Sequence, residues 1–250
     1  MRVVRRLFAL VALAAVAYGA YWSWKRVHRA DAASTTAALA AVARGGRATG
    51  VLPVGVWTAK QSGVSKATIS VLGVRRSLPA RALLEMVGGG ASVGLTWRFS
   101  VGTYDSFLVR QSDRGLLAVG GSIGGTTPVA SKATTGAFTK PIVLIPRRLR
   151  LGSAWSATYQ MGTSIVVRRS RVAGRETSKL TGAGVIWRIR VSEEWTGTTA
   201  SGSDEETILW SPKLHLPVGR IVDRNLQGSF SQDLQATLAL DATTPLAAAG

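Results

Sequence analysis

Two hydrophobic patterns divide the chain into a short N-terminal part and a long remainder. Residues Leu7–Trp24 form an apolar run of eighteen residues without a charge, and Tyr and Trp gather at its end. From Val51 onward, apolar residues instead alternate with polar ones in short runs that Gly, Ser and Thr clusters interrupt. The first pattern is typical of a membrane-spanning helix, and the second of β-sandwiches and barrels.

Three segments show the alternation most clearly: Val93–Val101, Val185–Val191 and Phe230–Leu240. Because successive side chains of a strand point to opposite faces, Trp97 and Trp187 are predicted to lie in the core. Other expected strands are Lys66–Leu72, Ser106–Gln111, Leu116–Val119, Ser164–Val172, Glu206–Trp210 and Arg220–Leu226, with a hairpin turn at Ser112–Gly115. The fold class predicted is therefore mainly β: an antiparallel curved sheet, sandwich or half-barrel, preceded by one N-terminal transmembrane helix.

The segment Pro79–Val87 can be interpreted in two ways. Its local composition favours a helix, but surrounding strands can override such a preference. We leave helix and strand open for it.

Four segments follow from these patterns. Residues 1–24 are expected to be a membrane anchor or signal sequence, 25–50 a juxtamembrane stalk, 51–241 an extracytoplasmic β domain and 242–250 a disordered tail. Basic residues flank the apolar run on both sides, and the free N-terminal amine favours the orientation with the N-terminus inside. The protein is thus predicted to be single-pass in the cell membrane, or secreted if the segment is cleaved.

Composition narrows the chemistry. The chain has no cysteine, which excludes disulfides, thiol metal sites and thiol nucleophiles. No P-loop, dinucleotide fingerprint or zinc spacing is present, so no cofactor is expected. The formal net charge of +18 points to anionic surroundings or to a solubilising surface.

The C-terminal half resembles a known group of proteins. Val172–Thr177 reads VAGRET and Ile208–Val218 reads ILWSPKLHLPV, with a strand between them. In these residues the chain resembles uncharacterised exported, membrane-anchored β-proteins of Gram-positive bacteria. The resemblance implies export and β structure, and no enzymatic residues.

One motif raises the possibility of a serine hydrolase. Gly120–Gly124 matches G-x-S-x-G around Ser122, and His215 is the one histidine outside the membrane-proximal segment. A nucleophile elbow needs a helix after the serine, whereas Gly, Thr and Pro follow here. We therefore expect no enzyme activity and no catalytic residues.

Acidic residues cluster at Glu193, Glu194, Asp204, Glu205 and Glu206. Calcium needs several converging oxygens, but neighbouring strand residues point to opposite faces, so at most half of these carboxylates can converge. A solvated hairpin end is the preferred interpretation, and no metal site is predicted.

Basic residues give the candidate binding site. Ten lie between Arg114 and Arg175 without an acidic residue among them. The densest groups are Arg147, Arg148 and Arg150, and Arg168, Arg169, Arg171 and Arg175. Guanidinium groups suit phosphate and carboxylate oxygens, so these residues are predicted to bind anionic lipids or phosphate-bearing wall polymers, unless they only solubilise the surface.

Nucleic acid is not expected as a partner. Trp97–Arg98 and Trp187–Arg188 pair a ring with a cation, but adjacent strand residues cannot share one groove. The leading hypothesis is a non-catalytic, membrane-anchored domain that binds anionic envelope components or acts as a cell-envelope scaffold. The alternatives are a lipid or hydrophobic-ligand carrier with a curved sheet and, more distantly, a serine hydrolase.

Overall fold

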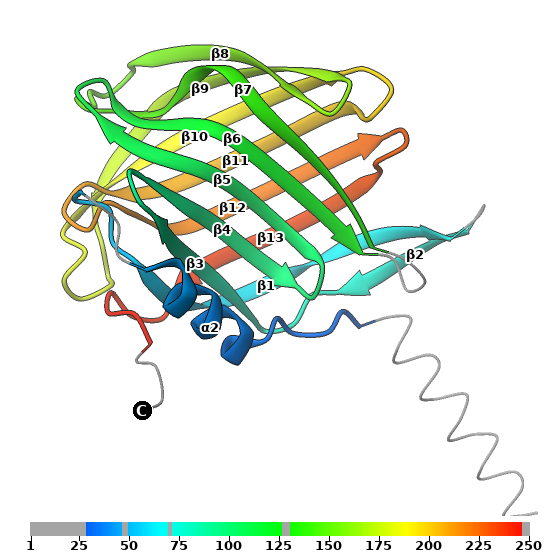
Figure 1. The fold of residues 1–250 in the computed structure, drawn as a ribbon, viewed down its shortest axis with the longest axis horizontal. Coiled ribbons are helices and arrows are strands. Elements are labelled where there is room, and N and C mark those ends of the chain that lie inside the picture. Colours follow the sequence, from blue (N-terminus) through cyan, green and yellow to red (C-terminus); the bar gives the residue numbers. More distant parts are fainter. Residues whose placement is uncertain (1–28, 47–49, 70–71, 127–130, 247–250) are drawn as a thin grey trace, which may run out of the picture.

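The computed structural model describes residues 29–46, 50–69, 72–126 and 131–246, which form one helix and a 13-stranded sheet (Figure 1). The elements are α2 (Thr35–Gly45), β1 (Gly55–Ile69), β2 (Leu72–Ser77), β3 (Arg81–Gly89), β4 (Ser92–Ser100), β5 (Thr103–Ser112), β6 (Gly115–Thr126), β7 (Ser131–Pro146), β8 (Ala154–Met161), β9 (Ser164–Thr177), β10 (Val185–Thr196), β11 (Ser201–Ser211), β12 (Leu216–Gln227) and β13 (Gln232–Leu240).

The strands form one antiparallel sheet that curls into a nearly closed, barrel-like shape. Its order is β7-β6-β5-β4-β3-β1-β13-β12-β11-β10-β9-β8, with β2 paired to β1. Most neighbours in the sheet are neighbours in the chain, and the pairing of β1 with β13 joins the two halves. The mainly β, antiparallel and curved fold predicted from the alternation is confirmed.

The two ends of this path, β7 and β8, meet without a continuous ladder. The amide of Gly162 donates to the carbonyl of Thr135 at 3.0 Å, and the indole of Trp155 donates to the carbonyl of Val143 at 3.1 Å. A Cβ on Gly136 would lie 2.1 Å from the carbonyl oxygen of Gln160, so only glycine allows this approach. We call this junction of β7 and β8 the seam.

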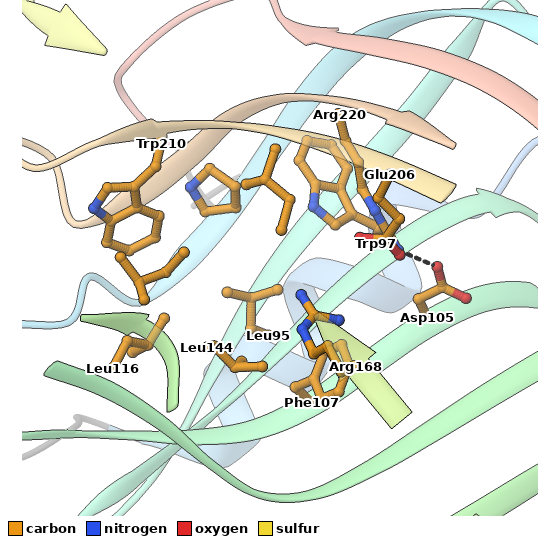
Figure 2. A pocket seen from close by; sticks show the side chains of 13 residues that line it. Leu95, Trp97, Asp105, Phe107, Leu116, Leu144, Arg168, Glu206, Trp210 and Arg220 are labelled. Atoms are coloured by element: carbon orange, nitrogen blue, oxygen red, sulfur yellow. Dashed lines mark hydrogen bonds and ion pairs between the residues drawn. The ribbon is translucent and has the colours of Figure 1, made fainter. Parts of the chain in front are cut away.

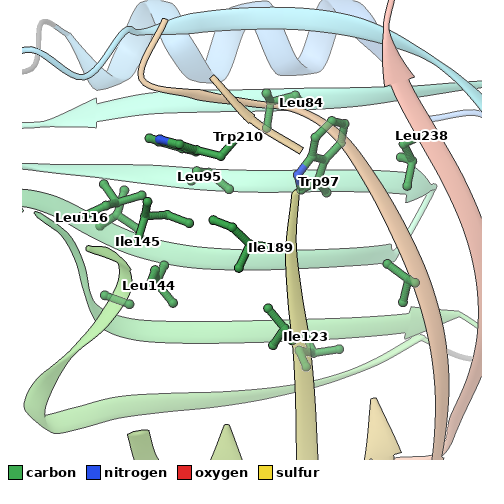
Figure 3. Packing of buried hydrophobic residues seen from close by; sticks show 14 of the residues in the cluster. Leu84, Leu95, Trp97, Leu116, Ile123, Leu144, Ile145, Ile189, Trp210 and Leu238 are labelled. Carbon is green, nitrogen blue, oxygen red and sulfur yellow. The ribbon is translucent and has the colours of Figure 1, made fainter. Parts of the chain in front are cut away.

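One hydrophobic core fills most of the interior (Figure 3). Alternation along β4 points Val93, Leu95, Trp97 and Phe99 inward, and all four are buried. The same rule holds on β13, where Leu234, Ala236, Leu238 and Leu240 are buried. The predicted inward faces of both strands are thus confirmed.

The structure decides one interpretation that was left open and corrects another. Arg81–Gly89 is strand β3, because pairing with β1 and β4 on both sides overrides its local helical preference. Trp187 is only partly buried, whereas Trp97 is 2% exposed. Near Trp187 the register between β9 and β10 shifts, since Ile189 pairs with Val172 but Arg188 pairs with Gly174.

The predicted stalk and tail both contact the sheet. Helix α2, capped by the Ser34 hydroxyl, packs Ala38 against Val56 and Leu83 on the outer face of β1 and β3. At the other terminus, Trp57 donates from its indole to the carbonyl of Thr243 at 3.0 Å. Part of the predicted disordered tail is therefore hydrogen-bonded to the domain.

The predicted anchor Leu7–Trp24 lies outside the described residues. Within the ranges that the structure describes, no helix is both long enough and apolar enough to cross a membrane.

Candidate functional site

Seven ionisable side chains point into the sheet and are almost completely buried. We call them the interior charge cluster: Asp105, Arg168, Glu193, Asp204, Glu206, Arg220 and Arg224. They come from β5, β9, β10, β11 and β12, at alternate positions that also carry apolar core residues. Burial of ions is costly unless each is paired, so their partners decide what the cluster does.

Arg224 holds the centre of the cluster. Its Nη1 and Nη2 donate to the two carboxylate oxygens of Asp105 at 2.6 and 3.0 Å, a bidentate pair across the interior. Its Nε donates to Oδ2 of Asp204 at 2.7 Å, and Nη1 also donates to the amide oxygen of Gln232 at 2.7 Å. Gln232 in turn donates to the carbonyl of Gly124 at 2.9 Å, which ties β13 to β6. The guanidinium therefore cross-links strands from both halves of the sheet.

The other two arginines complete the cluster. Arg220 pairs with Glu206 and, at 2.7 Å, with Asp105. Arg168 pairs with Glu193, whose carboxylate also accepts hydrogen bonds from the Tyr159 hydroxyl at 2.8 Å and the Trp195 indole at 3.3 Å. The interior cations thus all have carboxylate partners and offer no free charge to an incoming ligand.

The cluster contains four carboxyl groups and three guanidinium groups, so it has one excess negative charge when all of them are ionised. Asp204 is the carboxyl that is least favourable to ionise. Burial raises the pKa of Asp204 well above its usual value; Arg224 opposes this, while Glu206, Glu193 and Asp105 add to it. Its Oδ1 has no hydrogen-bond partner, so burial of this oxygen is not compensated. Burial also tends to raise the pKa of Asp105, but Arg224 and Arg220 outweigh it and hold that pKa below its usual value. Of the four carboxyls, Asp204 is thus the one whose protonation would make the cluster electrically neutral.

Asp204→Asn and Asp105→Asn should therefore differ sharply in stability at neutral pH. If the carboxyl of Asp204 carries a proton, Asp204→Asn replaces one neutral group with another and should lower the free energy of unfolding by less than about 1 kcal/mol. Asp105→Asn removes a buried counter-charge and should cost about 3 to 5 kcal/mol. Urea unfolding followed by tryptophan fluorescence measures both values. Equal losses would contradict the assignment of the proton to Asp204.

The pH dependence follows from the directions of these pKa shifts. The lowered pKa values of Asp105 and Glu206 contribute stability that is present above their unfolded values of about 4 and lost as pH falls through the folded pKa. The raised pKa of Asp204 contributes stability below that unfolded value, which is lost as pH rises through its folded pKa. Asp204→Asn should abolish the decrease in stability at rising pH that comes from Asp204. It should leave the decrease at acidic pH, which comes from Asp105 and Glu206, unchanged.

A small cavity remains beside the cluster (Figure 2). Its volume is about 50 Å³, and its apolar wall includes Leu95, Phe107 and Leu144. Trp210 and Leu116 lie at one end, and Asp105, Glu206 and Arg220 at the other. Pockets for drug-sized ligands measure about 300 to 1,000 Å³, so the interior as it stands is too small for a lipid.

No metal site is formed by the described residues: they contain no group of three or more His, Asp or Glu side chains that could hold an ion. Of the predicted acidic cluster, Glu193, Asp204 and Glu206 point inward and pair with arginines, whereas Glu194 and Glu205 are exposed. Alternation separates the buried from the exposed carboxylates, but three of the five point inward, which is more than the half that was predicted. The solvated hairpin end is wrong for the three buried members.

The outer face of β9 and β10 carries a second arrangement of charge. Arg169, Arg171 and Arg190 are exposed there and line a hollow of about 450 Å³, together with Ser156 and Glu205. Arg171 and Arg190 lie directly opposite each other across the two strands. Among the described residues neither has an ion-pair partner, while Arg169 reaches Glu194 at 3.5 Å. We call Arg169, Arg171 and Arg190 the outer arginine patch.

The seven arginines predicted as a binding surface do not form one surface. Arg168 is buried and paired with Glu193, so it cannot contact a ligand on the outer face. Arg175 lies over the ring of Trp187 at 5.5 Å. Arg147, Arg148 and Arg150 are exposed after β7, and their turn is joined to β9 by the 2.9 Å hydrogen bond from Gly152 to Val172. Arg169 and Arg171 remain together, and Arg190 on β10, which was not among the seven, joins them.

Ser122 does not lie on a nucleophile elbow. It is within strand β6, paired with Ser106, and its hydroxyl lies 3.2 Å from that of Tyr104. The glycines around it have a packing role, because a Cβ on Gly124 would lie 2.2 Å from the Tyr104 ring. The motif is thus explained by an aromatic ring packed on the strand.

Comparison of the chain with protein-family models, curated proteins and solved structures gives no significant match.

Proposed function

We propose that the protein is a non-catalytic binding domain, held at the outer side of the cell membrane by Leu7–Trp24, that recognises phosphate-bearing envelope components. The outer arginine patch carries this proposal. Arg171 and Arg190 are like charges directly opposite on neighbouring strands, an arrangement that is unfavourable without an anion. A phosphate group seated between them removes that repulsion and accepts charge-assisted hydrogen bonds.

The contrast between the interior and the outer face supports this choice. Inside, each arginine of the interior charge cluster is neutralised by carboxylates of the same fold. Outside, three arginines share a hollow with one carboxylate, Glu205. The exposed Arg148 and Arg150 lie in the connection between β7 and β8, which is hydrogen-bonded to β9 through Gly152 and Val172, and they extend the positive field.

Binding of a soluble polyphosphate by the full chain, held in micelles of an uncharged detergent, tests the proposal. Each basic residue near an anionic surface contributes about 1 kcal/mol, so reversal to Glu at Arg169, Arg171 and Arg190 should weaken binding by about 100-fold or more. Fluorescence anisotropy of a labelled polyphosphate measures the affinity, which should fall steeply with added salt.

A matched triple variant separates this site from net charge. Arg44, Lys60 and Arg81 are exposed on α2, β1 and β3, distant from β9 and β10 in the order of the sheet. Reversal of these three changes the net charge by the same amount but should leave affinity within about threefold. Equal losses in the two triple variants, or affinity that ignores salt, would refute the proposed function.

A further inference from the structure

One end of the barrel-like sheet opens into a second hollow, which we call the mouth pocket. Its volume is about 600 Å³, and it lies where β5 turns into β6, β7 ends and β11 turns into β12. Its floor contains Leu116, Ile145 and Trp210, the same three residues that line the outer end of the interior cavity. The mouth pocket and the interior cavity therefore lie on two sides of one apolar layer.

The rim of the mouth pocket is polar and carries a positive group. Arg147 and His215 line it, and Arg147 is exposed. Among the described residues, no hydrogen bond or ion pair uses the Arg147 guanidinium or the Trp210 indole N–H. Asp113, the carboxylate on this rim, accepts a hydrogen bond from the backbone amide of Arg114 at 2.9 Å. The pocket thus combines an apolar floor with a cationic donor that has no partner of its own.

His215 shapes this rim through its backbone. It is the one described non-glycine residue with positive φ, at 52°, in the turn between β11 and β12. Two hydrogen bonds of the Ser211 hydroxyl hold this turn. The hydroxyl donates to the carbonyl of Ala183 at 2.7 Å and accepts from the amide of Leu214 at 3.3 Å. A non-glycine residue in this conformation marks a turn held in place by its surroundings.

We propose that the mouth pocket binds a single-chain amphipathic carboxylate, such as a medium-chain fatty acid. The alkyl chain lies on Leu116, Ile145 and Trp210, and the carboxylate accepts hydrogen bonds from Arg147. The floor residues favour an alkyl chain, and the Arg147 guanidinium favours a negative head group beside it, while Asp113 carries a negative charge elsewhere in the lining. The interior cavity ends at paired charges, so the charged head stays at the rim.

Equilibrium dialysis of carboxyl-labelled octanoate against the full chain in uncharged micelles tests this inference, with protein-free micelles as the baseline. Arg147→Glu should weaken octanoate binding by at least about tenfold, the effect of losing a charge-assisted hydrogen bond. Val51→Trp, at a rim residue that is 60% exposed, should do the same by filling the pocket. Octanamide, which has the same chain length without the charge, should bind at least about tenfold more weakly than octanoate.

Arg148→Glu is the matched control, because Arg148 is the exposed neighbour of Arg147 and does not line the mouth pocket. Octanoate should bind this variant within about threefold of the wild type. Equal weakening in both single variants, or equal binding of octanamide, would overturn the inference. Charge reversal at the outer arginine patch should leave octanoate binding unchanged. The octanoate and polyphosphate experiments can therefore refute the two proposed sites independently of each other.

Discussion

Replacing Arg224 with leucine is expected to lower the free energy of unfolding by about 3 to 5 kcal/mol at neutral pH. The substitution leaves Asp105 without its bidentate partner and Asp204 without a donor, both in a dry interior. Arg220 still faces Asp105 at 2.7 Å, which limits the loss but cannot balance the remaining carboxylates. Urea unfolding followed by tryptophan fluorescence measures the change.

The pH dependence of this variant identifies the cause. Without Arg224, the pKa values of Asp105 and Asp204 are expected to rise above their unfolded values of about 4, because burial raises both and Arg224 is the largest opposing charge for each. Their stability is then present below that value and lost as pH rises, so the difference from wild type should shrink towards pH 4. A difference that stays constant with pH would indicate lost packing in place of an uncompensated charge.

Arg188→Leu is the control for this substitution. Arg188 pairs with Glu176 at 3.0 Å, and both side chains are nearly half exposed. Exposed pairs contribute about 0 to 1 kcal/mol, so this variant should unfold close to the wild type. The comparison of the two variants distinguishes the effect of losing a buried arginine from the effect of losing an exposed one.

The alternation of apolar and polar residues predicts a strand most reliably where one face of the strand is buried and the other is exposed to solvent. Strand β13 meets this condition along most of its length, whereas the other face of β4 is half-buried or, at Thr96 and Ser100, buried. The inward residues of both strands were identified correctly. Long-range pairing was not predictable in the same way, because the pairing of β1 with β13 joins residues that are 167 to 181 positions apart in the chain. Local propensity left β3 undecided between helix and strand for the same reason, since partners on both sides decide its conformation.

The interior charges had a signal that the sequence interpretation did not use. On β12, Leu216, Val218, Val222 and Leu226 share one parity, and Arg220 and Arg224 fall in phase with them. The same holds on β9, where Arg168 is in phase with Val166 and Val172. Arginine in phase with core residues predicts a buried partner, but which carboxylate supplies it depends on the closure of the sheet.

Trp97→Ala is expected to cost about 3 to 5 kcal/mol, whereas Trp187→Ala should cost clearly less, about 1 to 2 kcal/mol. Trp97 is 2% exposed within the core between β3 and β5, so truncation leaves a cavity that the closed sheet cannot fill. Trp187 is partly buried at the register shift, and its ring lies under the Arg175 guanidinium at 5.5 Å. Solvent can occupy the space that its truncation leaves.

Chemical unfolding of the two variants under the same conditions tests this contrast. The urea midpoint should fall further for Trp97→Ala than for Trp187→Ala, with similar slopes if both keep the same denatured state. Arg175→Gln should cost less than about 1 kcal/mol, the size of a cation–π contact at an exposed site. Equal losses for the two tryptophans would show that the register shift between β9 and β10 leaves Trp187 as well packed as Trp97, and the alternation of β10 would then run unbroken to Val185.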